Sequence, residues 1–289
     1  MPTLRERLAR PEILIAPGVY DAFTARLVEA AGFEAAFLSG AAVSFSLLGQ
    51  PDVGLATLTE MAERARSAAG AVGIPVLCDG DNGHGNALNV MRTVRLFEAS
   101  GAAAVQLEDQ SLPKRCGHLG GGKELISEAE MVGKIQAACA ARRSRDLLIV
   151  GRTDARGPLG LDEALRRARR YAEAGADVIF VEAPADRDEL AAIPRALPGV
   201  PLVANMVEGG KTPLLSAGEL EALSYRVVLF PSSLVRTFAR AGGELLALLR
   251  VRGTTAEFEG RMTSFAEVNR LMGLEEVGAL EGRFIPKDR

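Results

Sequence analysis

A short pattern recurs three times along the chain: an acidic, alanine-rich segment, then a glycine, then a brief apolar run. The three copies begin at Glu29, Glu98 and Glu173, and their apolar runs cover residues 35–39, 104–108 and 178–182. Glycine commonly ends a helix, and a short apolar run without alternation is typical of a strand that is buried on both faces. The pattern therefore predicts helices that lead into fully buried strands.

Further apolar runs of the same character bring the number of candidate strands to eight. They lie at residues 13–16, 74–78, 147–150, 201–204 and 226–229. Helices are expected between the strands, because Thr57, Ser127 and Ser216 are each followed three residues later by glutamate, as in a capping box. Residues 161–174 form another expected helix, with arginines on the face opposite its apolar stripe of Leu161, Leu165, Ala168 and Ala172.

Eight strand–helix units in about 250 residues predict an α/β fold, a (β/α)8 barrel. A doubly wound open sheet is the alternative, but no glycine-rich dinucleotide fingerprint follows the first strand. We expect the barrel to span residues 1–253 and a helical extension to span residues 254–289. Apolar residues recur in this extension at near-helical spacing, so it either caps its own barrel or packs on another subunit.

Composition argues against several classes of function. The net charge is only −3 with both signs interspersed, which gives no reason to expect a nucleic-acid partner. The sequence has no run of about 18 apolar residues, so neither a membrane span nor secretion is expected. Cys78, Cys116 and Cys139 lack the spacing of a zinc site and are typical of reduced thiols. We expect a cytoplasmic protein that acts on a small molecule.

The expected carboxyl ends of the strands are unusually polar, and in a barrel these ends carry the active site. They read Ser39-Gly40, Asp79-Gly80-Asp81, Glu108-Asp109, Arg152-Thr153-Asp154, Glu182, Asn205 and Pro231-Ser232-Ser233. Three carboxylates from two neighbouring strands, those of Asp79, Asp81 and Glu108, would converge. They would repel one another unless a cation neutralised them. Oxygen ligands favour Mg²⁺ or Mn²⁺ over zinc. The alternative for Asp79 and Asp81 is a glycine-rich Asx turn.

Other polar residues at these ends suit an acidic substrate. Arg152 and Asn205 offer donors for a substrate carboxylate, although a salt bridge from Arg152 to Glu182 or Asp154 is an alternative or an addition. Residues 114–118 read Lys-Arg-Cys-Gly-His, and nearby cations favour the thiolate of Cys116. The alternative is an inert thiol. Of the other candidates, His84 is expected to lie behind the metal turn, and Cys78 and Cys139 to fill space.

Several separate motifs in the same order resemble the isocitrate lyase / phosphoenolpyruvate mutase superfamily over residues 16–253. These are Ser39-Gly40, residues 49–54, 79–83, 108–110, 114–118, 152–155 and 205–210. The resemblance implies a Mg²⁺-dependent barrel that binds an α-keto acid or its enolate. It also implies a final helix swapped between neighbours and a homotetramer built as a dimer of dimers.

Carried over to this sequence, the resemblance implies a role for each motif. Asp79 would bind the metal directly, and Asp81, Glu108 and Asp52 would hold its waters. The keto-acid carboxylate would be bound by Ser39, Gly40 and Ala41. The keto or alkoxide oxygen would meet Arg152. Cys116 would be the general acid/base, Gly117 and His118 would contact a second carboxylate, and Glu182 and Asn205 would shape that end of the pocket.

The cysteine loop narrows the expected activity, because within the superfamily it belongs to the carbon–carbon lyases. Residues 205–213 most resemble the 2-alkylmalate-type lyases. We therefore expect cleavage of a 2-hydroxy di- or tricarboxylate, of 2-methylisocitrate or 2-alkylmalate type, to an α-keto acid plus a carboxylate such as succinate. The rivals are an oxaloacetate decarboxylase, which residues 85–94 also resemble, a carboxyphosphonate phosphorylmutase, and a non-catalytic metabolite-binding barrel. Asn82 and His84 depart from the family pattern beside the metal turn, which bears on substrate choice.

Overall fold

A computed structural model describes residues 2–115 and 123–285 of the chain. The chain divides into two compact units, Met1–Leu234 and Val235–Arg289, and each is described here by itself. The division falls inside a helix, whereas the sequence places a domain boundary after residue 253. The domain assignment from the sequence stays a prediction.

Unit 1 is a closed barrel of eight parallel strands, in which each strand pairs with the next and β8 pairs with β1. The strands are β1 (Leu14–Val19), β2 (Ala36–Leu38), β3 (Val76–Asp79), β4 (Ala104–Glu108), β5 (Leu148–Thr153), β6 (Val178–Val181), β7 (Leu202–Asn205) and β8 (Val227–Phe230). The predicted (β/α)8 barrel is therefore confirmed. Strand β4 has the predicted ends, and the ends of the other strands lie within three residues of those expected from the apolar runs.

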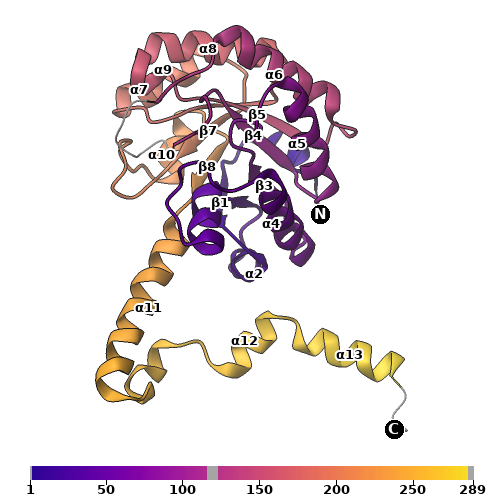
Figure 1. Cartoon of the computed structure of the whole chain (residues 1–289), viewed down its shortest axis with the longest axis vertical. Helices are drawn as coiled ribbons and strands as arrows, with labels where there is room; N and C mark the ends of the chain where they lie inside the picture. Colours follow the sequence, from indigo (N-terminus) through magenta and orange to yellow (C-terminus); the bar gives the residue numbers. More distant parts are fainter. Residues whose placement is uncertain (1, 116–122, 286–289) are drawn as a thin grey trace. The chain divides into compact units, whose positions relative to one another are not determined.

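Helices lie outside the ring of strands (Figure 1). They are α1 (Leu4–Leu8), α2 (Ala22–Ala30), α3 (Gly40–Val43), the π-helical turn η1 (Ser44–Leu48), α4 (Leu58–Ala71), α5 (Ala87–Ala99), α6 (Glu128–Ala141), α7 (Arg156–Leu159), α8 (Leu161–Glu173), α9 (Arg187–Ala196) and α10 (Ala217–Ala222). Thr57 and Ser216 form complete capping boxes as predicted, whereas Ser127 caps α6 without the reciprocal bond from Glu130.

One helix face differs from the prediction. In α8 the buried residues are Ala164, Arg167, Ala168 and Tyr171, so the expected stripe through Leu161, Leu165 and Ala172 is only half-buried. The physical reason is that Arg167 and Tyr171 find a buried carboxylate partner in Asp109. A buried charge that is paired and hydrogen-bonded costs far less than an isolated one, so arginine is tolerated on the inner face.

The core inside the barrel is formed by apolar side chains of the strands, including Phe37, Leu77, Leu148, Phe180 and Leu229. Leu4 and Leu8 of α1 belong to the same cluster, so this helix covers the amino-terminal end of the barrel. Strand register then places polar side chains at the opposite end. In the β4–β5 ladder Glu108 is paired with Arg152, the last pair of that ladder.

Unit 2 is helical, as expected for the extension. It contains most of α11 (Ser233–Arg252), followed by the 3-10 helix η2 (Ala256–Arg261), α12 (Phe265–Leu271) and α13 (Leu274–Phe284). Large apolar side chains of this unit are exposed in the single chain, among them Leu246, Val251, Phe265, Leu280 and Phe284.

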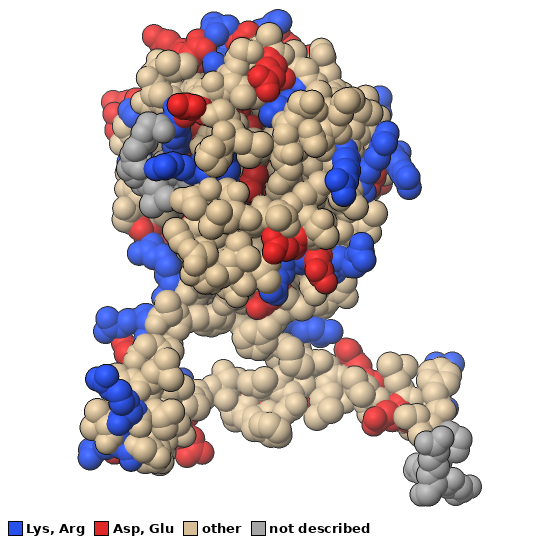
Figure 2. Space-filling view, in the orientation of Figure 1, with Lys and Arg blue, Asp and Glu red and all other residues tan. Residues whose placement is uncertain are grey.

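Surface charge of both signs is interspersed on the face drawn in Figure 2. Within residues 2–115 and 123–285, no helix is long and apolar enough to cross a membrane.

Candidate active site

Buried negative charge collects at one end of the barrel. The structure describes seven buried aspartate and glutamate residues; six lie at the carboxyl end of a strand or within two residues after it, and Asp52 follows η1. They are Asp52, Asp79, Asp81, Glu108, Asp109, Asp154 and Glu182. This end of a barrel is where catalytic residues are found. The three carboxylates that the sequence predicts to converge, those of Asp79, Asp81 and Glu108, are all buried at this end of the barrel.

The turn after β3 positions two of these carboxylates. Asp79 is the last residue of β3, and its Oδ1 accepts hydrogen bonds from the Asp81 N–H at 3.1 Å and from Gln106 Nε2 at 3.5 Å. Asp81 has a left-handed backbone with φ of 49°, which aspartate tolerates better than most residues. The Asx-type bond that the sequence left as an alternative is therefore present, but it does not turn the carboxylates outward, because both remain buried.

The end of β2 approaches the same turn closely. A Cβ atom on Gly40 would lie 2.8 Å from Asp79 Oδ2 and 3.3 Å from Asp81 Oδ1, so only glycine fits here without a shift. Ser39 caps the short helix α3, and Gly40 and Ala41 lie in its first turn, where N–H groups have no carbonyl partner within the helix. The structure thus places Ser39, Gly40 and Ala41 beside the carboxylate turn.

Lys114 supplies a cation that the sequence did not lead us to expect here. Its ammonium lies 2.7 Å from Asp52 Oδ1 and 2.6 Å from Asp81 Oδ1, and all three side chains are buried. Burial raises the pKa of Asp81 to about 6, although Lys114 opposes that shift. Burial would lower the pKa of Lys114, but Asp81, Asp79 and Asp52 outweigh it, and the ammonium stays protonated.

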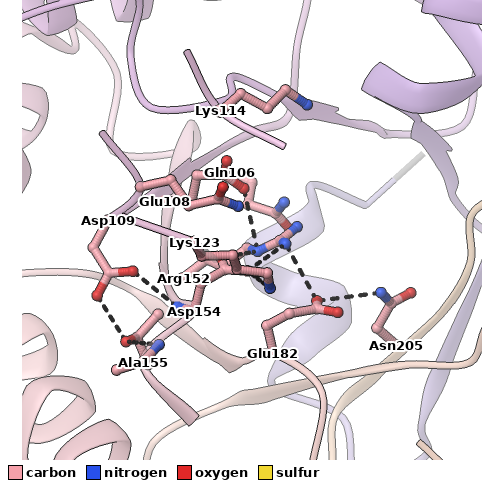
Figure 3. A network of polar contacts seen from close by, with 12 residues as sticks. Gln106, Glu108, Asp109, Lys114, Lys123, Arg152, Asp154, Ala155, Glu182 and Asn205 are labelled. Atoms are coloured by element: carbon pink, nitrogen blue, oxygen red, sulfur yellow. Dashed lines mark hydrogen bonds and ion pairs between the residues drawn. The ribbon is translucent and has the colours of Figure 1, made fainter. Parts of the chain in front are cut away.

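Arg152 links three of the carboxylates, as Figure 3 shows. Its guanidinium pairs with Asp154 through Nε at 2.9 Å and Nη2 at 3.1 Å, and it lies 3.3 Å from Glu108 Oε2 and 3.5 Å from Glu182 Oε2. The ring of Phe180 lies beneath it, with the guanidinium carbon 5.0 Å from the ring centroid. The salt bridges to Glu182 and Asp154 that the sequence left open are both formed.

These contacts set the charge of the neighbouring acids. Burial raises the pKa of Glu108 well above its usual value, although Arg152 opposes the shift. Burial acts in the same direction on Asp154, but Arg152 and Lys123 outweigh it and lower the pKa of that carboxyl. Lys123 Nζ lies 2.5 Å from Asp154 Oδ1. The site therefore combines a carboxylate that stays ionised with a nearby carboxyl that is poised to hold a proton.

Strand β7 contributes a residue on the side of Arg152 that faces away from Asp109 (Figure 3). Asn205, the last residue of that strand, donates a hydrogen bond from Nδ2 to Glu182 Oε2 at 3.3 Å. Glu182 and Asn205 thus lie together on the side of Arg152 away from Asp109 (Figure 3).

Asp109 is a buried carboxylate that holds the end of β5 in place, and we call it the Asp109 anchor. The sequence analysis did not identify this role. It accepts hydrogen bonds from Thr153 Oγ1 at 2.7 Å, the Asp154 N–H at 2.8 Å, Tyr171 OH at 2.8 Å and Arg167 Nη1 at 3.1 Å. These bonds fix the end of β5, which carries Arg152. The four-residue spacing of Glu163, Arg167 and Tyr171 on α8 was a detectable signal, since it places an arginine and a tyrosine on one helix face.

Three predicted residues, Cys116, Gly117 and His118, lie outside the described residues. Of the remaining candidates, Cys78 is fully buried in β3 and burial raises the pKa of its thiol, in keeping with a filling role. Burial lowers the pKa of His84, which has a left-handed backbone in the turn after β3. In the described part of the chain, no three His, Cys, Asp or Glu side chains alone have the geometry to hold a metal ion.

Substitution of Asp109 should greatly lower the free energy of unfolding. Asp109→Asn removes the charge that Arg167 pairs with inside the protein, and breaking a buried pair costs about 3–5 kcal/mol. Tyr171→Phe removes one hydrogen bond to the same carboxylate and should cost only about 1 kcal/mol. Urea unfolding followed by circular dichroism measures both. Equal losses in the two variants would contradict the assignment of Asp109 as the anchor.

Comparison with known proteins places this geometry in a family. Residues 4–249 match the family model described as phosphoenolpyruvate phosphomutase. The chain is 48% identical to 2,3-dimethylmalate lyase of Eubacterium barkeri, over 97% of this chain and 96% of that protein. It is 45% identical to 2-methylisocitrate lyase of Aeropyrum pernix, over 94% and 87%.

Solved structures agree with these relatives. Oxaloacetate acetylhydrolase in complex with the inhibitor 3,3-difluorooxalacetate superposes with a TM-score of 0.94 and 34% identity, covering 99% of this chain and 97% of that one. Phosphonopyruvate hydrolase in complex with oxalate and Mg²⁺ superposes with a TM-score of 0.88 and 34% identity, covering 98% of each chain.

Relatives named lyases at this identity and coverage confirm the expected enzyme class, a carbon–carbon lyase, and leave the substrate open. The chain belongs to the phosphoenolpyruvate phosphomutase family, within the PEP mutase/isocitrate lyase superfamily.

Proposed function

We propose that the protein is a Mg²⁺-dependent lyase that cleaves a 2-hydroxy di- or tricarboxylate, of 2-alkylmalate or 2-methylisocitrate type, to an α-keto acid plus a carboxylate such as succinate. The observation that carries the proposal is the gathering of buried carboxylates around Arg152 at the carboxyl ends of the barrel strands. Relatives named 2,3-dimethylmalate lyase and 2-methylisocitrate lyase support the substrate class.

The described residues fit a divalent cation. Glu108 Oε1 is buried and has no hydrogen-bond partner among the described residues, and Asp79 Oδ2 faces the space that a Cβ on Gly40 would fill. Carboxylate oxygens suit Mg²⁺, with Mn²⁺ as the alternative cation. A site without three converging protein ligands is ordinary for Mg²⁺, because the ion keeps several waters and binds through one or two carboxylates plus substrate. The Mg²⁺ in a phosphonopyruvate hydrolase structure supports the choice.

Four of the carboxylates of the site have a proposed part in holding the cation. Asp79 would bind it directly, while Asp81, Glu108 and Asp52 would hold its waters. When bound, Mg²⁺ acts as a Lewis acid that polarises the oxygens of the substrate.

The neighbouring residues are proposed to bind the substrate. Ser39 and the N–H groups of Gly40 and Ala41 would bind the carboxylate of the part that becomes the keto acid. Arg152 would stabilise the hydroxyl oxygen as it becomes a keto oxygen. The other carboxylate would be met by Gly117 and His118, with Glu182 and Asn205 shaping that end of the pocket.

Two proton transfers complete the proposed reaction. The substrate hydroxyl loses its proton as the carbon–carbon bond breaks, and Glu108 would accept that proton because it lies 3.3 Å from Arg152, which would meet the same oxygen. The thiol of Cys116 then gives a proton to the carbon of the departing carboxylate. Cys116 is assigned this part from the sequence alone.

Cleavage of oxaloacetate is the second candidate. The likeness to oxaloacetate acetylhydrolase in complex with an oxaloacetate analogue favours it. A phosphorylmutase also remains among the alternatives, because a relative 44% identical carries the name carboxyvinyl-carboxyphosphonate phosphorylmutase. The expectation of a cytoplasmic protein stays a prediction from the sequence.

A substrate panel separates the candidates. Purified protein is incubated with Mg²⁺ and each member of a set of C4–C7 2-hydroxy di- and tricarboxylates, and with oxaloacetate, and products are identified by mass spectrometry with EDTA as the control. An α-keto acid plus a carboxylate from an alkylated malate or isocitrate is expected. Pyruvate, or oxalate and acetate, from oxaloacetate alone would overturn the proposal in favour of the second candidate.

If Cys116 is the proton donor, its substitution should reduce cleavage without changing metal binding. Cys116→Ser should reduce cleavage by about 10²–10⁴-fold, because a hydroxyl is a far weaker acid than a thiol, while Mn²⁺ binding stays unchanged. Cys139→Ser is the matched control, since Cys139 is half-buried in α6 and should leave the rate unchanged. Steady-state assays measure both variants. A Cys116→Ser protein with full activity would rule out this role.

We also propose that unit 2 packs on another copy of the chain, as in a homotetramer of helix-swapped dimers. Its exposed Phe265, Leu280 and Phe284 support this, because large apolar side chains that are exposed in a single chain are often covered by a partner. Light scattering should show a tetramer that Leu280→Lys with Phe284→Lys converts to a smaller species. A monomer in the unsubstituted protein would contradict the proposal.

A further inference from the structure

Lys134 is a buried lysine of α6 that has no part in the proposed reaction. Its Nζ donates a hydrogen bond to the Asn82 carbonyl at 3.1 Å. The carboxylate of Glu130 lies 4.0 Å from the same nitrogen, but that side chain is half-exposed. Burial lowers the pKa of Lys134, and Glu130 opposes the shift. The ammonium therefore lies inside the protein and is bound to a neutral backbone group.

Packing alone does not explain a lysine at this position. An ammonium loses its hydration on burial, and a hydrogen bond to a carbonyl replaces only part of it. A methionine of similar length would fill comparable space without that loss. What the lysine adds is a donor that reaches Asn82, 52 positions earlier in the chain.

The carbonyl that Lys134 binds belongs to the turn after β3, which carries Asp81 and follows Asp79. Every backbone carbonyl of this turn is hydrogen-bonded. The donors to the carbonyls of residues 80–83 are, in order, the N–H of Gly83, the N–H of Glu108, Lys134 Nζ and Thr93 Oγ1. Lys134 on α6 and Thr93 on α5 are both buried, so side chains of two helices hold the turn from outside the barrel.

The conformation of this turn needs such support. Asp81 and His84 both have left-handed backbones, with φ of 49° and 58°, which residues other than glycine adopt rarely. Gly83 lies so close to α5 that a Cβ there would clash with the Val90 side chain. If the bond to Asn82 were lost, its peptide group could rotate, and the carboxylate of Asp81 would move with it.

We propose that Lys134 is a positioning residue for the cation site, because it holds the Asn82 peptide and so keeps the neighbouring Asp81 carboxylate directed at the waters of the cation. This inference rests on the proposed function. Lys134 acts through the backbone of the turn and not by contact with the cation or the substrate.

The chain offers a matched control at the opposite end of the barrel. Arg7 of α1 is also a buried cation that donates to a backbone carbonyl, that of Glu12 at 2.9 Å. Arg7→Met therefore removes a buried cation from the protein without touching the turn after β3. Any loss that follows only from weaker packing or lower stability should appear in both variants.

Titration of the full chain with Mn²⁺, followed by the electron paramagnetic resonance signal of the free ion, tests the inference. Lys134→Met should bind Mn²⁺ about 10–100-fold more weakly than the unsubstituted protein, as is typical when a group that orients metal ligands is removed. Thr93→Val, which removes the neighbouring bond to the turn, should weaken binding in the same direction. Arg7→Met should stay within about twofold of the unsubstituted protein, because distant sites act independently.

Two further variants keep the test decisive. Lys134→Arg retains a donor and should bind Mn²⁺ more tightly than Lys134→Met. Lys134→Leu also lacks a donor and replaces Lys134→Met if that protein does not fold, as judged by circular dichroism. Unchanged Mn²⁺ affinity in the folded variant without a donor would overturn the inference and leave the cation site intact. No Mn²⁺ binding by the unsubstituted protein would instead overturn the proposed cation site, and the inference with it.

Discussion

Buried negative charge at the carboxyl end of the barrel is the constraint on which the rest of the site depends. Seven described carboxylates are buried there, and removing a charged group from water is costly unless it is paired. Lys114, Lys123, Arg152 and Arg167 contact them, so within this group the acids still outnumber the cations. A buried charge without compensation is costly, and the divalent cation proposed for this site would balance part of the remaining negative charge.

The barrel explains how residues so far apart in sequence reach one place. Parallel strands with matched register bring the ends of β3, β4, β5, β6 and β7 to the same rim, and the pairing of Glu108 with Arg152 follows directly from the β4–β5 ladder. Two sets of polar contacts then hold these strand ends, one centred on Arg152 and the other on Asp109. Arg152 collects Glu108, Asp154 and Glu182, whereas Asp109 and α8 hold the β5 end in position behind it.

Much of this was predictable from the sequence, because buried parallel strands leave a local signal. Short apolar runs, three of them preceded by glycine, indicated all eight strands, and polar residues after seven of these runs pointed to the carboxyl end of the barrel. Lys114 and Arg167 were not assigned their contacts, since a lysine in a basic loop and an arginine on a charged helix both resemble solvated residues until their partners are known. The partner of Arg167, Asp109, lies 58 positions away. No local pattern reports a contact across that separation.

The proposed reaction depends on a divalent cation that is held by the carboxylates at the ends of β3 and β4. Mn²⁺ binding to the unsubstituted protein and to Asp79→Asn, measured by equilibrium dialysis with metal analysis, tests it most directly. One Mn²⁺ per chain is expected in the unsubstituted protein, and most of that binding should be lost in Asp79→Asn while circular dichroism shows that the fold is retained. Binding of equal stoichiometry and affinity in the two proteins would contradict it.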